Sequence, residues 1–433
     1  MARLFGPVAA PARLFFGLAL VAEHAGVRAL RLDACAAISS RVVRDNITLS
    51  DMLLENPREG KPHDKFEDGF AGNSRDLPWK GMWWRRVLDS GSFAKVFAME
   101  LSEIVSACPH VRWVLKVSKA PVFKSSLSGR ALKDVCVAHV FAGMPDVAPP
   151  VLRVFDMRIQ QGHAFVLMHR ADWDLFVWAK AHKYSLTHPE TLAAKLILSH
   201  QLFEGIHRMH TLGEGLVHCD IKPDNVMVHG LQAFLIDFEF ARRVNDTRPW
   251  LAGTRDFMSP EYLHSQVCGR ETDIWAAGVT LFLLFLNRYP YQPYTSDRAA
   301  FLHHSKSFAA TMAKNGAQRD ELRKVFALLF AQCCNVDLGA TLFGMFRSLF
   351  NEDAAVRVEA FSGVLADAAR LAKAAAGYLK VPWPVPAAGG AEGATAQCAE
   401  AVQQLAEGPL HPVFNTTAGI GGVQRCLEWD KKA

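Results

Sequence analysis

Short apolar runs separated by polar turns fill the first part of the chain. Each run has the length of a strand, and several of them alternate between apolar and polar positions. They predict strands at residues 82–88, 111–117, 151–155 and 164–168.

Apolar residues recur at helical spacing in the second part of the chain. Residues 192–210 keep this repeat, and residues 292–348 are also helical in pattern. The run 279–286 is apolar except for Thr280, which suits a buried helix and is too short to span a bilayer. Strands early and helices late predict an α+β fold.

The first residues of the chain have a different pattern. Arg3 and Arg13 precede the apolar run 14–22, and small residues follow it, so we expect residues 1–29 to be a signal peptide. The alternative is an apolar amino-terminal helix of a cytosolic protein, because Glu23 and two prolines interrupt the pattern.

Polar and breaker residues mark two further segments. Residues 30–80 are rich in Pro, Gly, Asn and charges, and we expect them to be an amino-terminal extension. Residues 371–433 are rich in Ala, Gly and Pro and are expected to be a linker and a carboxyl-terminal tail. The predicted strands and helices therefore define one functional domain at residues 81–370.

Composition sets limits on the class of protein. The chain has 433 residues, 50% of them hydrophobic, which is enough for a packed core. A net charge of +5 gives no argument for a nucleic-acid partner, and we expect no transmembrane segment. Nine cysteines show no CxxC pair and no metal-ligand spacing. If the chain is secreted, one or two disulfides among the later cysteines are expected, with pairing and oligomeric state left open.

The segment 215–225 places an acid, a lysine and an amide close together, as Asp220, Lys222 and Asn225. Asp237 follows in the run FLIDFEF. Phosphoryl transfer requires a carboxylate that orients and deprotonates the attacking hydroxyl, a cation on the migrating charge, and oxygen ligands for Mg²⁺. These four residues supply that set.

The string HCDIKPDN resembles the catalytic loop of the protein kinases, and DFE at 237–239 resembles their metal-binding DFG triplet. An APE-type segment, GTRDFMSPE at 253–261, and a DxWxxG helix start at 272–278 follow in the family's order. The resemblance implies a two-lobed protein-kinase fold, with a small β-rich N-lobe and a large helical C-lobe.

The resemblance also implies roles for single residues. Asp220, Lys222 and Asn225 would be catalytic, and Asn225 and Asp237 would bind Mg²⁺ or Mn²⁺. Lys116, in the apolar run 111–117, would hold the α- and β-phosphates of ATP. A lysine at a strand edge with its head in solvent is the alternative for this position.

Other nucleotide contacts are assigned by the same resemblance. Met168 and Arg170 fall at the hinge, where Met168 would line the back of the adenine pocket. Gly91 matches one glycine of the phosphate-binding loop, whereas Asp89 and Ala94 stand where two others would be. Glycine there lets backbone N–H groups approach phosphates, so these replacements weaken the match.

The segment 131–142 resembles the kinase αC helix, but it contains no glutamate to pair with Lys116. Asp134 is the nearest substitute. Because its side chain is one methylene shorter, we expect the ion pair to be stretched or bridged by water.

Three further positions bear on structure and regulation. Glu261 and Arg357 match a structural ion pair of the family, and Asp273 begins its DxWxxG helix. Cys219 replaces the arginine that in many kinases binds an activation-loop phosphate. We therefore predict that residues 245–251 need no phosphate for activity.

Glu239 replaces the DFG glycine. If its carboxylate faces the cleft, it would join Asp237 as a metal ligand, or it would repel the nucleotide in the absence of metal. The alternative is that Glu239 points to solvent and has no role.

Lys222 and the segment GTRDFMSPE fit serine/threonine kinases, which implies Ser or Thr hydroxyls of protein substrates and ATP as the donor. A pseudokinase scaffold and a small-molecule phosphotransferase are the alternatives. The string LMHRADWDL is similar to the hinge of the secreted rhoptry kinases of apicomplexan parasites. This narrower resemblance implies a secretory route, with the parasite rhoptry and a host cell as destinations.

Overall fold

The structure is a computed structural model, and its described residues form two compact units. The helical unit comprises Trp178–His200 and Thr247–Pro384, and the sheet unit comprises the described residues up to Val177, Gln201–Asp246 and residue 385. The structure describes residues 77, 79, 82–90, 94–101, 113–118, 133–138, 141, 152, 154–160, 163–182, 189–211, 215–294, 297–313, 320, 323 and 336–385.

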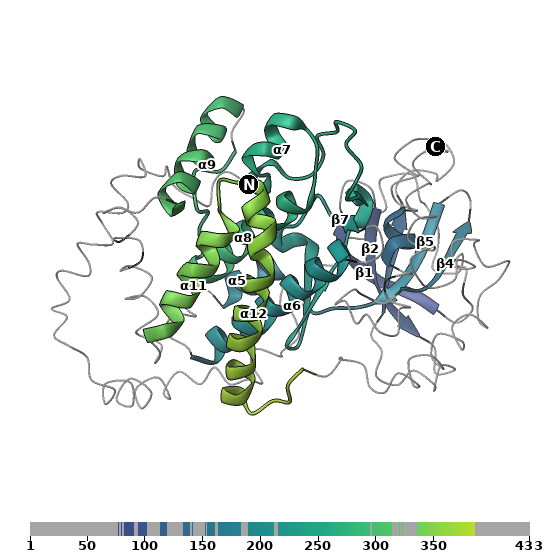
Figure 1. Cartoon of the computed structure of the whole chain (residues 1–433). Coiled ribbons are helices and arrows are strands. Elements are labelled where there is room, and N and C mark those ends of the chain that lie inside the picture. Colours follow the sequence, from purple (N-terminus) through teal and green to yellow (C-terminus); the bar gives the residue numbers. More distant parts are fainter. Residues whose placement is uncertain are drawn as a thin grey trace. The chain divides into compact units, whose positions relative to one another are not determined.

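The sheet unit contains a five-stranded antiparallel sheet with the order β1-β2-β3-β5-β4 (Figure 1). Its strands are β1 (Met82–Ser90), β2 (Ala94–Leu101), β3 (Trp113–Ser118), β4 (Val154–Gln160) and β5 (His163–His169). The register sets Lys116 opposite Val96 on one side and Val166 on the other, so the lysine lies in the middle strand of the sheet.

Two smaller sheets in the same unit hold the loops that carry the predicted chemistry. β6 (Trp173–Asp174), β8 (Val226–His229) and β9 (Gln232–Leu235) form one, and β7 (Leu216–Val217) and β10 (Arg242–Arg243) form the other. Two 3₁₀ turns lie between these strands. They are η2 (Pro223–Asn225) and η3 (Phe238–Phe240).

Helices α5 (Leu175–Ala181) and α6 (Pro189–Thr211) run from one unit into the other. The helical unit continues with η4 (Arg255–Phe257), α7 (Pro260–Ser265), α8 (Arg270–Leu286), α9 (Arg298–Ala313), α11 (Val336–Leu349) and α12 (Ala354–Leu379). Helices α11 and α12 pack against each other and against α8 (Figure 1).

Aromatic side chains fill the space around α8. Phe282 packs edge-on against Phe308 and Phe346, with ring centroids 5.8 and 5.4 Å apart. Phe350 packs in the same way against Phe308 and Trp275. This packing explains why the predicted apolar run is buried on nearly all sides, as the sequence indicated.

Capping residues determine where these helices begin and end. The Ser259 hydroxyl accepts a hydrogen bond from Tyr262 N at 3.3 Å, and Asp353 Oδ1 accepts from Ala355 N and Val356 N at the start of α12. Asn287 and Lys380 adopt the left-handed conformation that ends α8 and α12.

The four predicted strands and the helices predicted at 192–210 and 279–286 are present, with shifted boundaries. Of the predicted helical stretch 292–348, the described residues include the helices Arg298–Ala313 and Val336–Leu349. β4 lies at Val154–Gln160, later than the predicted 151–155. The domain boundary predicted at residue 370 falls inside α12, which continues to Leu379 because Ala375 and Ala376 bury their side chains. The alanine-rich composition there reflects a close-packed helix rather than a linker.

The signal peptide predicted at 1–29, almost all of the extension at 30–80 and the tail beyond residue 385 lie outside the described residues. Among the helices that are described, none is long and apolar enough to cross a membrane.

Candidate active site

The segment after β7 gathers the three predicted catalytic residues into one hydrogen-bonded cluster. Asp220 is only 4% exposed, and its Oδ2 accepts hydrogen bonds from Lys222 Nζ at 2.8 Å and from Asn225 Nδ2 at 2.9 Å. Asn225 Nδ2 also donates to the backbone oxygen of Asp220 at 2.9 Å. The two donors hold the Asp220 carboxylate in one orientation.

Backbone conformation turns the chain sharply at this cluster. Cys219 has a φ of 66°, in the left-handed region that residues other than glycine rarely adopt. Such torsions persist only where surrounding contacts enforce them, and they concentrate at functional sites. Cys219 is also disulfide-bonded, as are Cys136 and Cys268.

Asp237 lies beside the same cluster through contacts between two loops. Ile236 N donates to Asn225 O at 3.1 Å, and Ile236 O lies 3.0 Å from His218 Nε2. Asp237 itself has a φ of 68° and begins the 3₁₀ turn η3. Asp237, two residues after the end of β9, is thereby held next to the segment that follows β7.

Lys116 contacts two carboxylates. Its Nζ lies 2.7 Å from Asp134 Oδ2 and 3.8 Å from Asp237 Oδ1. The stretched or water-bridged pair that we expected for Asp134 is therefore wrong, because the helical segment 133–138 brings the shorter side chain within direct reach. The other oxygen of Asp134 accepts a hydrogen bond from Phe238 N at 2.7 Å.

The electrostatics of the site follow from burial and crowded charge. Burial by itself lowers the pKa of the Lys116 ammonium. The charges of Asp134 and Asp237 together raise it by more than burial lowers it, so its pKa lies above the ordinary 10.5. Burial also raises the pKa of Asp237, and Lys116 offsets part of this effect.

Glu239 is buried, with 4% of its surface exposed. The alternative in which it points to solvent is therefore wrong. Burial, together with the charges of Asp237 and Asp134, raises the pKa of Glu239 to about 8. Its carboxylate belongs to the electronegative surroundings of the site.

Phe238 anchors the turn that carries these acids. It is fully buried, and its ring lies 6.2 Å from Phe141 in a stacked arrangement and 5.1 Å from His218. Sequence reasoning assigned no role to Phe141 or His218. Their aromatic side chains could have indicated a packing role, because Phe141 lies in the segment 131–142 and His218 lies two positions before Asp220.

The remaining nucleotide contacts predicted from the sequence are only partly placed. Met168 pairs with Val114 and Val154 in the sheet, and Arg170 directly follows β5; both are half-buried. Gly91 lies outside the described residues. Sequence reasoning also missed Asp172, whose Oδ2 lies 2.7 Å from His229 Nδ1 just after the hinge.

The donor set near Asp237 fits a divalent cation. Asn225 uses its Nδ2 to contact Asp220, which turns its amide oxygen away from that carboxylate. Carboxylate and amide oxygens are the ligands that Mg²⁺ and Mn²⁺ prefer. Within the described part of the chain, no three His, Cys, Asp or Glu residues form a ready metal site. Asp237 and Asn225 would therefore hold the metal together with phosphate oxygens.

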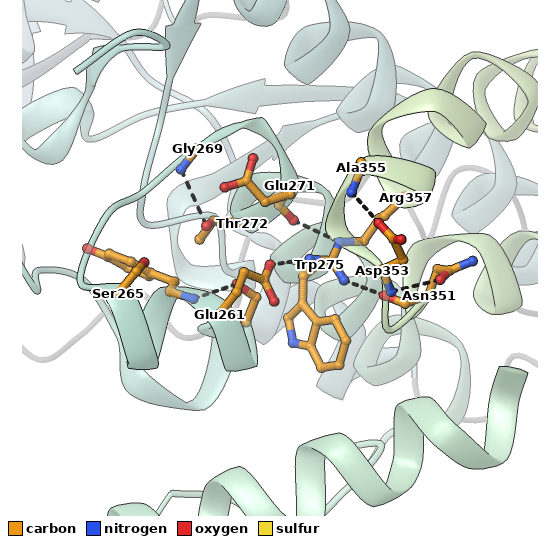
Figure 2. Close-up of polar contacts among 12 residues, drawn as sticks. Glu261, Ser265, Gly269, Glu271, Thr272, Trp275, Asn351, Asp353, Ala355 and Arg357 are labelled. Atoms are coloured by element: carbon orange, nitrogen blue, oxygen red, sulfur yellow. Dashed lines mark hydrogen bonds and ion pairs between the residues drawn. The ribbon is translucent and has the colours of Figure 1, made fainter. Parts of the chain in front are cut away.

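In the helical unit, Arg357 and Glu261 form the ion pair that the sequence predicts (Figure 2). Arg357 is 1% exposed, and its Nε donates to Glu271 O at 3.1 Å and its Nη1 to Asn351 O at 2.5 Å. Its guanidinium lies 5.2 Å from the ring centroid of Trp275. The arginine thus joins α7, α8 and the start of α12. Asp273 is buried in the first turn of α8.

Comparisons with known proteins agree with this geometry. A family model described as the protein kinase domain matches residues 87–341. The calcium/calmodulin-dependent protein kinase type II of Caenorhabditis elegans is 37% identical over 97 residues, which cover 21% of this chain and 13% of that protein. The smooth-muscle myosin light chain kinase of Gallus gallus is 36% identical over 96 residues, or 21% of this chain and 5% of that protein.

The chain thus spans only a small part of the length of these curated relatives. Among solved structures, the kinase of Cydia pomonella granulovirus has a TM-score of 0.46 and 18% identity, covering 66% of this chain and 93% of that chain. Because the family model covers more than half of the chain, this protein belongs to the protein kinase family and has its α+β fold.

Proposed function

We propose that this protein transfers the γ-phosphoryl group of ATP to Ser or Thr hydroxyls of protein substrates. The observation that carries the proposal is the cluster in which Lys222 and Asn225 both donate to Asp220 Oδ2. The Lys116–Asp134 pair, 3.8 Å from Asp237, supports it. The sheet unit thus contains Asp220 for the substrate hydroxyl, Lys116 for the phosphates and Asp237 for the metal.

Each residue then has a distinct task. Asp220 orients the substrate hydroxyl and accepts its proton as the hydroxyl oxygen attacks the γ-phosphorus. Lys222 stabilises negative charge on the migrating phosphoryl group, and Lys116 binds the phosphates that remain with ADP. Asp237 and Asn225 would hold a Mg²⁺ or Mn²⁺ ion, which would supply positive charge to neutralise the phosphates.

The choice of Ser and Thr rests on the sequence. Lys222 follows Asp220 by two positions, and the segment 253–261 resembles the peptide-binding ledge of serine/threonine kinases. This segment argues against a small-molecule substrate. Phosphate transfer from ATP to a generic basic protein tests the proposal, with Asp220→Asn as the inactive comparison.

A pseudokinase is the second candidate, favoured by Asp89 and Ala94 in the glycine-rich loop and by Glu239. The direct Lys116–Asp134 contact argues against it, because that pair is the part expected to be impaired. Stabilisation by ATP with no transfer, at equal levels for wild type and Asp220→Asn, would establish the pseudokinase instead.

We further propose that the protein is secreted, as a kinase of the rhoptry type. The pattern of residues 1–29 and the string LMHRADWDL support this route. The disulfides of Cys136, Cys219 and Cys268 also support it, because disulfides persist mainly in oxidising compartments. Mass spectrometry of the mature protein tests the route: an intact amino terminus would remove the support that residues 1–29 give it.

A further inference from the structure

The connection between β5 and β6 consists of residues 170–172, and both of its ends are held against β8. At the end of the connection, Asp172 N donates to Val228 O at 3.0 Å, and β6 then pairs with β8. Just before its start, the ring of His169 lies 5.3 Å from the ring of His229 in an edge-on arrangement. All of these residues belong to the sheet unit.

His229 contacts both ends of this connection. Its Nδ1 lies 2.7 Å from Asp172 Oδ2, and Nδ1 is the donor because a carboxylate oxygen accepts. Of the two side chains, that of Asp172 is 4% exposed and that of His229 is 24% exposed, so water competes little for the carboxylate oxygen. One imidazole therefore joins His169 and Asp172 to the end of β8.

The position of β8 relates this contact to the candidate active site. β8 begins directly after Asn225, whose side chain donates to Asp220, and it ends at His229. The predicted adenine contacts, Met168 and Arg170, flank His169 in the sequence. The segment predicted to bind the base is thus attached to the same strand that continues from the catalytic cluster.

We propose that His229 and Asp172 position the hinge, residues 168–170, for the base of ATP. This inference rests on the proposed function, because it concerns the same nucleotide. His229 is a positioning residue that acts on the base through the hinge. Groups that are held in place before binding lose less conformational freedom when the ligand arrives, so the hydrogen bond raises the affinity for the base and leaves the phosphate contacts unchanged.

Two substitutions of His229 separate the hydrogen bond from the ring. His229→Asn keeps a donor near the position of Nδ1, whereas His229→Leu keeps an apolar side chain and has no donor. We expect His229→Leu to bind ATP about tenfold more weakly than wild type in isothermal titration calorimetry, and His229→Asn to bind within about threefold of wild type. Adenosine, which has the base and no phosphates, should lose affinity by the same factors. His264→Leu, at an exposed position on α7, is the control and should bind as wild type does.

Asp172→Ala removes the acceptor of the same hydrogen bond and should give the same loss as His229→Leu. If either variant fails to fold, the other remains as the test. Unchanged ATP affinity in the folded variant would overturn the inference. A loss for ATP without a loss for adenosine would also overturn it, because the effect would then lie at the phosphates. An equal loss in His229→Asn would show that the donor is irrelevant, with the same consequence.

Phosphate transfer to a basic protein is measured separately. A wild type that transfers phosphate, with variants that bind ATP as it does, would refute the inference alone. A wild type that transfers no phosphate, with variants that bind ATP and adenosine more weakly, would refute the proposed function alone.

Discussion

Asp134 contacts Lys116 and Phe238 at the same time. Its Oδ2 lies 2.7 Å from Lys116 Nζ, and its Oδ1 accepts a hydrogen bond from Phe238 N at 2.7 Å. One carboxylate therefore fixes both Lys116 and the turn that carries Asp237. The two contacts can be separated by substitution.

Asp134→Asn should lower the kcat/KM for ATP by about tenfold or more. The amide oxygen still accepts from Phe238 N, but the charge that holds Lys116 is lost, and hydrogen bonds to charged groups contribute about 1.5–3 kcal/mol. Asp134→Ala should in addition lower the free energy of unfolding, because Phe238 N loses its acceptor. Steady-state kinetics and urea unfolding measure the two effects. Full activity of Asp134→Asn would show that the Lys116 contact is dispensable.

Phosphatase treatment should leave the activity unchanged. Arg242, buried on β10, already pairs with Asp246 at 2.8 Å, so a carboxylate supplies the negative charge that a loop phosphate brings elsewhere. Cys219 offers no second cation. Loss of activity after dephosphorylation would contradict the prediction.

Asp246→Ala should lower the free energy of unfolding by about 3 kcal/mol, because Arg242 loses this buried ion pair. Asn245→Ala, at an exposed position, is the control.

Arg357→Ala should lower the free energy of unfolding by about 3 kcal/mol or more. The substitution leaves Glu261 and two backbone oxygens without the guanidinium that now contacts them. Arg370→Ala removes an exposed pair with Asp367 on α12, which is expected to contribute at most about 1 kcal/mol. Urea unfolding of the two variants measures the contrast. Similar losses in both would show that burial of the pair is unimportant.

Gly278→Ala should destabilise the protein by about 1–3 kcal/mol. A Cβ at this position would lie 3.1 Å from Leu349 Cβ and from Phe350 Cζ, in the packed contact between α8 and α11. Gly363→Ala on α12 meets nothing within 4 Å and should stabilise the helix by up to about 1 kcal/mol. Thermal unfolding compares the two variants, and equal effects would refute the packing argument.

Lys195 should make stability depend on pH. It is 1% exposed, its Nζ donates to Leu284 O at 2.5 Å, and burial lowers its pKa from 10.5 to about 7. Between these values the unfolded chain binds a proton that the folded protein does not, so the contribution of Lys195 to stability rises with pH. Stability measured from pH 7 to 10.5 should therefore rise more steeply in wild type than in Lys195→Met. Parallel curves would show that the folded protein keeps the lysine charged.

The sequence by itself determined the protein kinase family and the local part of the site. Asp220, Lys222 and Asn225 lie within a few residues of one another, so the backbone of a single loop brings them together. The pair of Glu261 and Arg357 was also predicted, because a family resemblance transfers distant contacts along with the motif. Amphipathic spacing was sufficient for the existence of the helices but not for their ends.

Only the tertiary structure decided how distant segments meet. The distance between Asp134 Oδ2 and Lys116 Nζ depends on where the helical segment 133–138 packs. The shorter side chain of aspartate, compared with glutamate, did not by itself predict that distance. Glu239 lies inside the protein because Phe238 is held between Phe141 and His218. In the same way, α12 extends to Leu379 because neighbouring side chains bury its alanines. Each of these outcomes depends on packing between residues far apart in the chain, which local pattern and propensity do not encode.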